Sequence, residues 1–358
     1  GPWIGAAGRL SPDSEDNSGI SGLLQRIEEL VKANEGSFDQ QDRQDYLSDY
    51  YHMMGRYYIR VADYDRGLAY IQKLVEFNQP IDSEQCRKNL VKANRQKICV
   101  YMNRYEPEPM RELVQSSIQL LTGHSKPEEM AIWNRLQGMN DIMTGDLADS
   151  QQQFVQAIDI FEHSMEKEQY RYNLAASYAG LGEAKRMQGD YEGALSCYEE
   201  AIANCKDYRL SGSAATFYTY AGQAAVDSGD LDQAEEYLSK AVECFNKIEL
   251  LWERGIAFSY FGRLHVLRGR YQEALTSLLI AKRCSEQLES RYELGVLNRI
   301  FAQIALEMEQ NPELRAVFSE YITCPPETYV ERARDLLAPV YSPVDEAYLR
   351  QVEEQSAQ

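Results

Sequence analysis

The sequence predicts an all-α protein that is built as a solenoid of paired helices. The main observation is a period of 40 residues that separates Gly182, Gly222 and Gly262. Three more columns of small residues keep the same spacing: Gly189, Gly229 and Gly269; Ala194, Ala234 and Ala274; and Ala201, Ala241 and Ala281. A fixed period of roughly 20 to 50 residues is typical of solenoids and repeat arrays. We therefore expect units that bury their apolar faces against one another and leave a long concave surface for a partner.

Within one unit, residues 175–206, two stretches of helical periodicity are separated by Gly189 and Asp190. Gly182 in the first stretch and Ala194 in the second would let two antiparallel helices come close, and a larger side chain there typically costs about 1 to 3 kcal/mol. Gly189 can take the left-handed conformation that ends a helix, and Asp190 can cap the helix that follows.

These residues resemble the tetratricopeptide repeat, a helix-turn-helix unit of about 34 residues. The matching features are an aromatic residue, a Leu-Gly pair, a Gly-Asp-Tyr turn and two later alanines, and residues 174–207 show all of them. Upstream, Gly138 fits the glycine column of a weaker unit. The resemblance implies a right-handed α-solenoid of about seven helix pairs with flanking capping helices. Its units lie near 48–79, 86–121, 131–163, 174–207, 214–247, 254–287 and 294–321.

The flanks differ from the repeats in composition. Residues 1–18 are small and polar without periodicity, so we expect a disordered lead-in, and Gly1-Pro2 resembles a protease-cleavage scar. We expect the superhelix to extend over residues 19–341. Residues 342–358 are expected to form a capping helix and tail, because the last repeat would otherwise leave its apolar face in water.

Composition limits the possible partners. The net charge of −19 argues against direct nucleic-acid binding, which needs a basic surface. No apolar run approaches the length that crosses a bilayer, so no membrane contact is expected. The seven cysteines are odd in number and scattered, which favours reduced thiols and a cytoplasmic location.

Charged residues are nevertheless expected in the groove. In tetratricopeptide superhelices the first helix of each unit lines the concave side, and the resemblance places five arginines there: Arg56, Arg135, Arg186, Arg263 and Arg299. Arginine recognises carboxylates with two parallel hydrogen bonds, so this column is a candidate site for an acidic or carboxylate-bearing segment. The alternative is that these arginines are solvated or pair with some of the 56 acidic residues. Replacing Arg186 and Arg263 by alanine would separate the two.

Other candidates for the groove are neutral. Asn134 and Asn298 could hold the backbone of an extended peptide, or simply serve the helix surface. Met139 and Met187 could form an adaptable apolar floor, or fill the core as methionine usually does.

Motifs of catalysis are missing from the sequence. None of the four histidines has the spacing of a zinc-binding helix, and there is no phosphate-binding glycine loop, nucleophile elbow or paired-cysteine metal site. We therefore expect a non-enzymatic protein without a metal or cofactor.

The long period and the turns also resemble the sensor arms of bacterial signal-transduction and transcription regulators of the maltose-regulator type, and the peptide-pheromone receptors. That resemblance implies a groove for a peptide, a protein segment or a small inducer. Two alternatives stay open: a general protein–protein interaction adaptor, and a docking module that regulates a partner enzyme.

Overall fold

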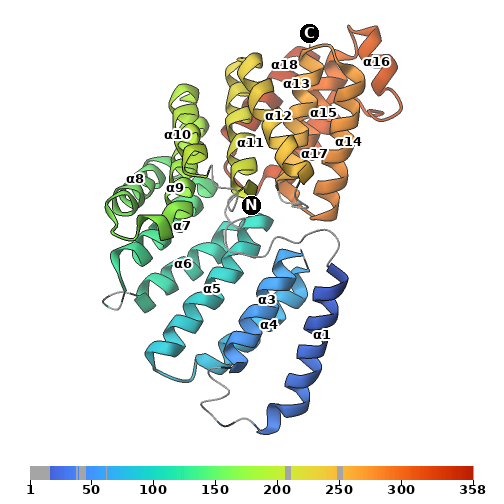
Figure 1. Cartoon of the computed structure of the whole chain (residues 1–358). Coiled ribbons are helices and arrows are strands. Elements are labelled where there is room, and N and C mark those ends of the chain that lie inside the picture. Colours follow the sequence, from blue (N-terminus) through green and yellow to red (C-terminus); the bar gives the residue numbers. More distant parts are fainter. Residues whose placement is uncertain are drawn as a thin grey trace. The chain divides into compact units, whose positions relative to one another are not determined.

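The computed structural model describes residues 17–37, 39, 46–61, 63–121, 123, 125–205, 211–247 and 253–357 (Figure 1). Every regular element in these ranges is a helix, and helices that follow one another pack in pairs, so the predicted all-α solenoid is confirmed. Most of the expected lead-in, residues 1–16, lies outside the described part. The helices are α1 (Asn17–Asn34), the 3-10 helix η1 (Glu35–Ser37), α3 (Ser48–Arg60), α4 (Tyr64–Asn78), α5 (Glu84–Arg104), α6 (Pro107–Leu121), α7 (Pro127–Thr144), α8 (Leu147–His163), α9 (Lys167–Met187), α10 (Tyr191–Asn204), α11 (Ser211–Ser228), α12 (Leu231–Lys247), α13 (Arg254–Leu267), α14 (Tyr271–Gln287), α15 (Arg291–Glu307), α16 (Pro312–Phe318), α17 (Pro326–Leu337) and α18 (Pro343–Ser356).

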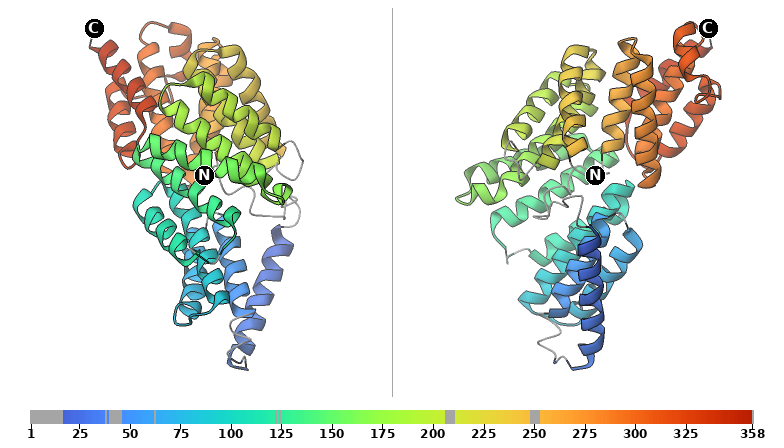
Figure 2. Two further views of the ribbon diagram at one scale, coloured as in Figure 1. Left: turned by 90° about the vertical axis from the view of Figure 1, so that its left-hand side faces the viewer. Right: turned by 45° about the vertical axis from the view of Figure 1, so that its right-hand side comes forward.

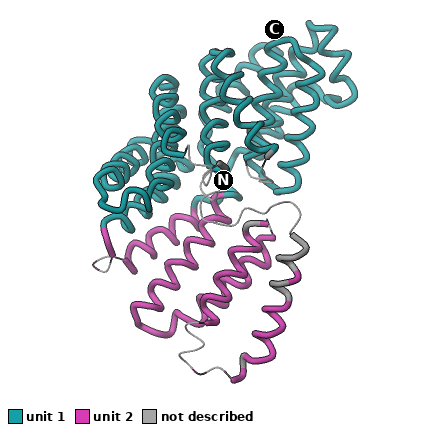
Figure 3. Tube along the Cα trace, in the orientation of Figure 1, with its two compact units in different colours: residues 1–7, 103–107, 127–358 teal, residues 8–102, 108–126 magenta. Residues whose placement is uncertain are grey.

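The chain divides into two compact units (Figure 3). Unit 1 contains residues 1–7, 103–107 and 127–358, and unit 2 contains residues 8–102 and 108–126.

Unit 1 is a run of antiparallel helix pairs: α7 with α8, α9 with α10, α11 with α12, α13 with α14, and α15 with α17 (Figure 2). The first members of these pairs also contact one another in succession, from α7 to α9, α11, α13 and α15. They form one continuous surface, which we call the first-helix face.

The small-residue columns lie in the seams between paired helices. A Cβ atom added to Gly182 would lie 2.8 Å from the ring of Tyr198 and 3.1 Å from the carbonyl oxygen of Ala194. Ala194 and Ala201 are fully buried. The close approach that the sequence predicted is therefore present.

The predicted turn between paired helices is also confirmed. Gly189 has a φ of +83°, in the left-handed region that an L-residue avoids. The carboxylate of Asp190 accepts a hydrogen bond from the backbone nitrogen of Gly193 at 2.9 Å and so caps α10.

The last pair differs from the expected unit at 294–321. Helix α15 packs against α17, whereas α16 packs against α14. The reason is length, since α16 has seven residues and cannot cover the 17 residues of α15. The 12-residue helix α17, which begins at Pro326, takes that place.

The C-terminal helix does more than cover the last pair. Helix α18 contacts α15 and α17, and the hydroxyl of its Tyr348 donates a hydrogen bond to Asp227 of α11 at 3.0 Å. It therefore lies along the first-helix face.

Unit 2 is joined by buried amides. The side-chain nitrogen of Asn78 on α4 donates to the hydroxyl of Ser48 on α3 at 3.0 Å, and that of Asn89 on α5 donates to the oxygen of Asn78 at 2.9 Å. A second bond joins α5 to α6, because Asn94 donates to the hydroxyl of Ser117 at 3.0 Å. Buried polar groups of this kind require each partner, so they fix which helices pack together.

Candidate functional site on the first-helix face

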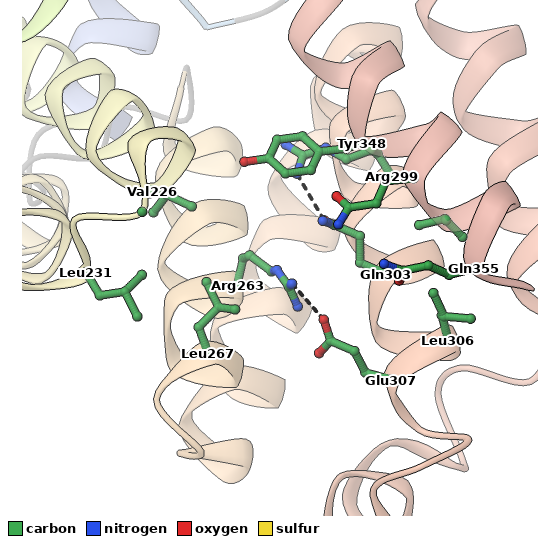
Figure 4. Close-up of a pocket in the computed structure, with 13 residues that line it drawn as sticks. Val226, Leu231, Arg263, Leu267, Arg299, Gln303, Leu306, Glu307, Tyr348 and Gln355 are labelled. Carbon is green, nitrogen blue, oxygen red and sulfur yellow. Dashed lines mark hydrogen bonds and ion pairs between the residues drawn. The ribbon is translucent and has the colours of Figure 1, made fainter. Parts of the chain in front are cut away.

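A pocket of about 390 Å³ opens on the first-helix face between α11, α13, α15 and α18 (Figure 4). Its walls are mixed in character, with apolar side chains from α11, α12 and α13 and polar side chains from α13, α15 and α18. The lining residues are Val226, Gly229, Leu231, Arg263, Leu267, Arg299, Gln303, Leu306, Glu307, Tyr348, Gln351, Val352 and Gln355. Pockets of this volume and mixed lining are typical of ligand sites.

Arg263 of α13 is a buried cation at this pocket. Its Nη2 atom lies 2.7 Å from Oε1 of Glu307, and its side chain is 9% exposed. Its Nη1 atom is buried and has no hydrogen-bond partner among the described residues. A buried donor without a partner costs about 1 to 3 kcal/mol, so an acceptor atom that reached Nη1 after a shift of the surrounding side chains would gain that free energy.

Arg299 of α15 lies at the same pocket but has its donors filled. Its Nε atom donates to Asp345 at 3.1 Å, its Nη1 atom to Gln303 at 3.1 Å and its Nη2 atom to the hydroxyl oxygen of Tyr260 at 2.9 Å. The ring of Tyr348 lies over the guanidinium, 4.5 Å from its carbon to the ring centroid. Arg299 is therefore held by α13, α15 and α18 together.

Arg186 of α9 occupies the centre of a second, connected network. Its Nε and Nη2 atoms donate to the two carboxylate oxygens of Glu183 at 3.0 and 2.8 Å, and its Nη1 atom donates to Asp227 of α11 at 2.7 Å. The hydroxyl of Tyr198 also donates to Glu183, at 2.8 Å. Burial alone would raise the pKa of Glu183, but Arg186 and Tyr198 outweigh burial and hold that pKa below its ordinary value. Because Asp227 also binds Tyr348, the network continues from α9 to α18.

The structure brings only some of the predicted groove residues together. Arg263 and Arg299 share the pocket, and Arg186 joins them through Asp227. The alternative to an open anion site was that the arginines pair with neighbouring carboxylates. Arg186 and Arg299 are paired in this way, and Arg263 is paired with Glu307 through one nitrogen. Arg186 is 1% exposed and therefore is not open to a ligand in this structure.

The remaining candidates lie elsewhere. Arg56 is half-buried on α3 in unit 2, and Arg135 is buried on α7. Met139 and Met187 are buried, and Asn134 is half-buried. The side-chain nitrogen of Asn298 donates to the carbonyl of Leu294 in its own helix at 2.7 Å.

Sequence reasoning missed the acidic and aromatic members of the site. The hydrogen bonds of Asp227, Asp345 and Tyr348 join different helix pairs, so no motif within one repeat marks these residues. One periodic signal was present: Glu183, Gln223, Arg263 and Gln303 occupy one column at intervals of 40 residues, and Gln223, Arg263 and Gln303 are buried on this face. Polar residues that recur at buried positions of the period would have pointed to the network.

Two buried carboxyls, also 40 residues apart, form a separate feature of unit 1. Glu253 accepts hydrogen bonds from the hydroxyls of Tyr220, at 2.8 Å, and Thr216. Glu293 accepts one from the hydroxyl of Ser285 at 3.0 Å. Burial raises the pKa of Glu253 and raises the pKa of Glu293 to about 7. Unit 1 therefore contains an acid that titrates near neutral pH.

The described residues contain no group of three or more histidine, cysteine, aspartate or glutamate side chains arranged to hold a metal ion. Over the same residues, no helix is long and apolar enough to cross a bilayer.

Comparisons with known proteins identify the repeats. Family models of the tetratricopeptide repeat match residues 48–80, 128–207 and 179–247. Among curated proteins, none matches the sequence significantly. The resemblance to regulators of the maltose type stays a prediction.

Solved structures share the fold at low sequence identity. A Rap protein complexed with Competence and Sporulation Factor has a TM-score of 0.62 and 14% identity, over 95% of this chain and 93% of that one. Aspartyl phosphate phosphatase F from Bacillus subtilis has a TM-score of 0.53 and 14% identity, over 94% and 90%. The Rap conjugation gene regulator of plasmid pLS20 with the Phr* peptide has a TM-score of 0.51 and 12% identity, over 87% and 95%. At these identities the likeness concerns the fold. The family-model matches show that the chain contains tetratricopeptide repeats, over residues 48–80 and 128–247.

Proposed function

We propose that this chain is a non-enzymatic scaffold that binds a peptide or protein segment on the first-helix face of unit 1, as the sensor or interaction arm of a cytoplasmic regulator. The observation that carries the proposal is the pocket of about 390 Å³ at which buried Arg263 keeps an N–H without a partner. Two solved structures of the same fold add support, because one is a complex with Competence and Sporulation Factor and the other a complex with the Phr* peptide.

The lining indicates what kind of group would bind. Arg263 offers a donor to a carboxylate or a carbonyl oxygen, and Gln351 and Gln355 are exposed amides at the rim. Leu267 also lines the pocket, on the side of Arg263, and its 42% exposed side chain gives an apolar contact (Figure 4). A segment with one acidic or carbonyl group next to an apolar side chain would fit this lining. A small carboxylate-bearing inducer would meet the same groups.

The test uses Leu267, because replacing the ion-paired Arg186 would disturb folding as well as binding. Affinity capture from extracts, read by mass spectrometry with a small-molecule fraction, would compare the wild-type protein with Leu267→Glu. The new carboxylate would repel an acidic ligand and remove the apolar contact. We expect the partner to be reduced roughly tenfold, the equivalent of about 1.4 kcal/mol.

A matched control is available on α14. Leu279 is 40% exposed, similar to Leu267, and does not line the pocket. Leu279→Glu should therefore capture the same partner as the wild-type protein. Equal recovery of every partner by Leu267→Glu and the wild-type protein would refute binding at this pocket.

A further inference from the structure

Helix α18 contacts the first-helix face through polar groups as well as through apolar ones. Asp345 binds Arg299 of α15 at 3.1 Å, and these side chains are 3% and 1% exposed. Three residues further along the same side of α18, the hydroxyl of Tyr348 binds Asp227 of α11 at 3.0 Å. The C-terminal helix thus already provides a carboxylate to an arginine that the sequence placed in the ligand groove.

The packing around α18 is incomplete on two sides. The pocket of about 390 Å³ lies between α18 and the first helices, and a second pocket of about 420 Å³ lies between α18, α17 and the segment that joins them. Side chains that border such spaces lose dispersion contacts that a dense core would provide. Leu349 and Val352 are the buried apolar residues of α18 beyond its first turn. Arg334 of α17 adds ion pairs with Glu346 and Glu353 of α18, at 3.0 and 2.5 Å, but these side chains are 35–43% exposed and such pairs contribute little. The helix is therefore held by two buried apolar side chains and by polar contacts.

Because of these polar contacts, only a partner with matching groups can take the place of α18 without a large loss of free energy. If α18 left without replacement, Arg299 would lose its carboxylate partner and Asp227 would lose the Tyr348 hydroxyl. Breaking one side of a buried pair is strongly unfavourable. If an incoming helix supplied a carboxylate and a phenol at the same spacing, both buried groups would be satisfied again and the exchange would be close to neutral.

We propose that α18 is an exchangeable occupant of the first-helix face. The partner that replaces it is an amphipathic helical segment with a carboxylate and, three residues later, a tyrosine followed by an aliphatic residue. Such a helix would bind with one face in the groove, as helical ligands commonly do. This inference rests on the proposed function in its claim that a partner binds this face. It adds the chemistry of a helical partner and a closed state in which α18 covers Arg299 and Asp227, while the pocket beside Arg263 stays open.

The experiment uses a fluorescein-labelled peptide of residues 342–358 as the probe and fluorescence anisotropy as the readout. The full-length protein with Asp345→Asn and Tyr348→Phe keeps the shape of α18 but loses its ion pair and its phenol hydrogen bond. We expect the peptide to bind this variant roughly tenfold or more tightly than it binds the wild-type protein, whose own α18 competes. A control peptide that carries the same two substitutions should bind the variant roughly tenfold more weakly.

Two results would overturn the proposal: no binding of the peptide to the variant, or equal binding of the two peptides. Hydrogen exchange on the wild-type protein gives a second measurement that does not depend on a variant. The amides of α18 should exchange faster than those of α15 at a temperature where the protein stays folded. Exchange of α18 only together with α15 would also overturn it. The peptide test needs no natural partner, so its failure would leave the Leu267-dependent capture untouched, and the reverse also holds.

Discussion

The seams between paired helices and the first-helix face of unit 1 are built from opposite kinds of residue. In the seams, Gly182 and Ala194 allow two helices to touch because they are small. On the first-helix face, Arg186 and Arg299 are among the largest fully buried side chains. Whether two helices can touch in a seam depends on the size of their side chains, and these side chains belong to the same repeat. A buried charge, in contrast, needs a partner that lies in another repeat. Arg186, for example, binds Asp227, which follows it by 41 residues.

The largest expected effect comes from breaking the charged network. Arg186→Met removes the cation between Glu183 and Asp227 and leaves two carboxylates without it, of which Asp227 is 1% and Glu183 15% exposed. Removal of one partner of a buried ion pair typically costs about 3 to 5 kcal/mol. We expect a loss of that size in the free energy of unfolding, measured by urea denaturation.

Two variants sharpen this prediction. Adding Asp227→Asn to Arg186→Met removes one of the two unbalanced charges and should recover part of the loss. Lys240→Met breaks an exposed pair with Glu236 at 2.6 Å and should cost less than about 1 kcal/mol. If Arg186→Met and Lys240→Met cost the same, the network would not contribute as the geometry indicates.

The second effect concerns pH. Burial raises the pKa of Glu293 to about 7 from an ordinary value of 4.5. Between these values the folded protein keeps a proton that the unfolded chain releases, so the free energy of unfolding falls as the pH rises from 4.5 to about 7. The total loss from this group is roughly 3 kcal/mol.

Glu293→Gln should remove this dependence, because an amide stays neutral and can still accept the hydrogen bond from Ser285. At about pH 8 the variant should be more stable than the wild-type protein by roughly 3 kcal/mol, and at about pH 4 the two should nearly agree. Thermal denaturation across this pH range measures the difference. Glu309→Gln, on an exposed side chain, is the control. Parallel pH profiles for Glu293→Gln and the wild-type protein would contradict the buried, protonated carboxyl.

The same contrast explains how far the sequence could predict the structure. The 40-residue columns predicted the paired helices, the turn at Gly189 and the cap at Asp190, because each depends on residues within one unit. The pairing of α15 with α17 was missed, because it depends on α16 being too short to cover its neighbour.

The candidate site was less predictable than the fold. Sequence placed Arg186 and Arg299 on the first helices but could not choose between a ligand and an internal carboxylate as their partner. The choice depends on contacts between distant repeats and on the position of α18, from which Asp345 reaches Arg299, 46 residues earlier in the chain. Arg263 had the same sequence signal as Arg186, and its different state follows from its neighbour Glu307, which satisfies only one side of the guanidinium.

The smallest expected effect tests the seam by replacing glycine with alanine. The change in the free energy of unfolding should have opposite signs inside and outside the seam. Gly182→Ala and Gly22→Ala make the same change inside an α-helix, which favours the folded state by up to about 1 kcal/mol through helix propensity. Nothing lies within 4 Å of a Cβ added to Gly22, so Gly22→Ala should be neutral or stabilising. At Gly182 the added Cβ would be 2.8 Å from the ring of Tyr198, which is fully buried and bound to Glu183. Because that ring cannot move without breaking its hydrogen bond, overpacking should outweigh propensity, and we expect Gly182→Ala to destabilise by about 1 to 2 kcal/mol in urea denaturation. Stabilisation by both substitutions would mean that the seam tolerates a methyl group and that close approach is not the reason for the glycine column.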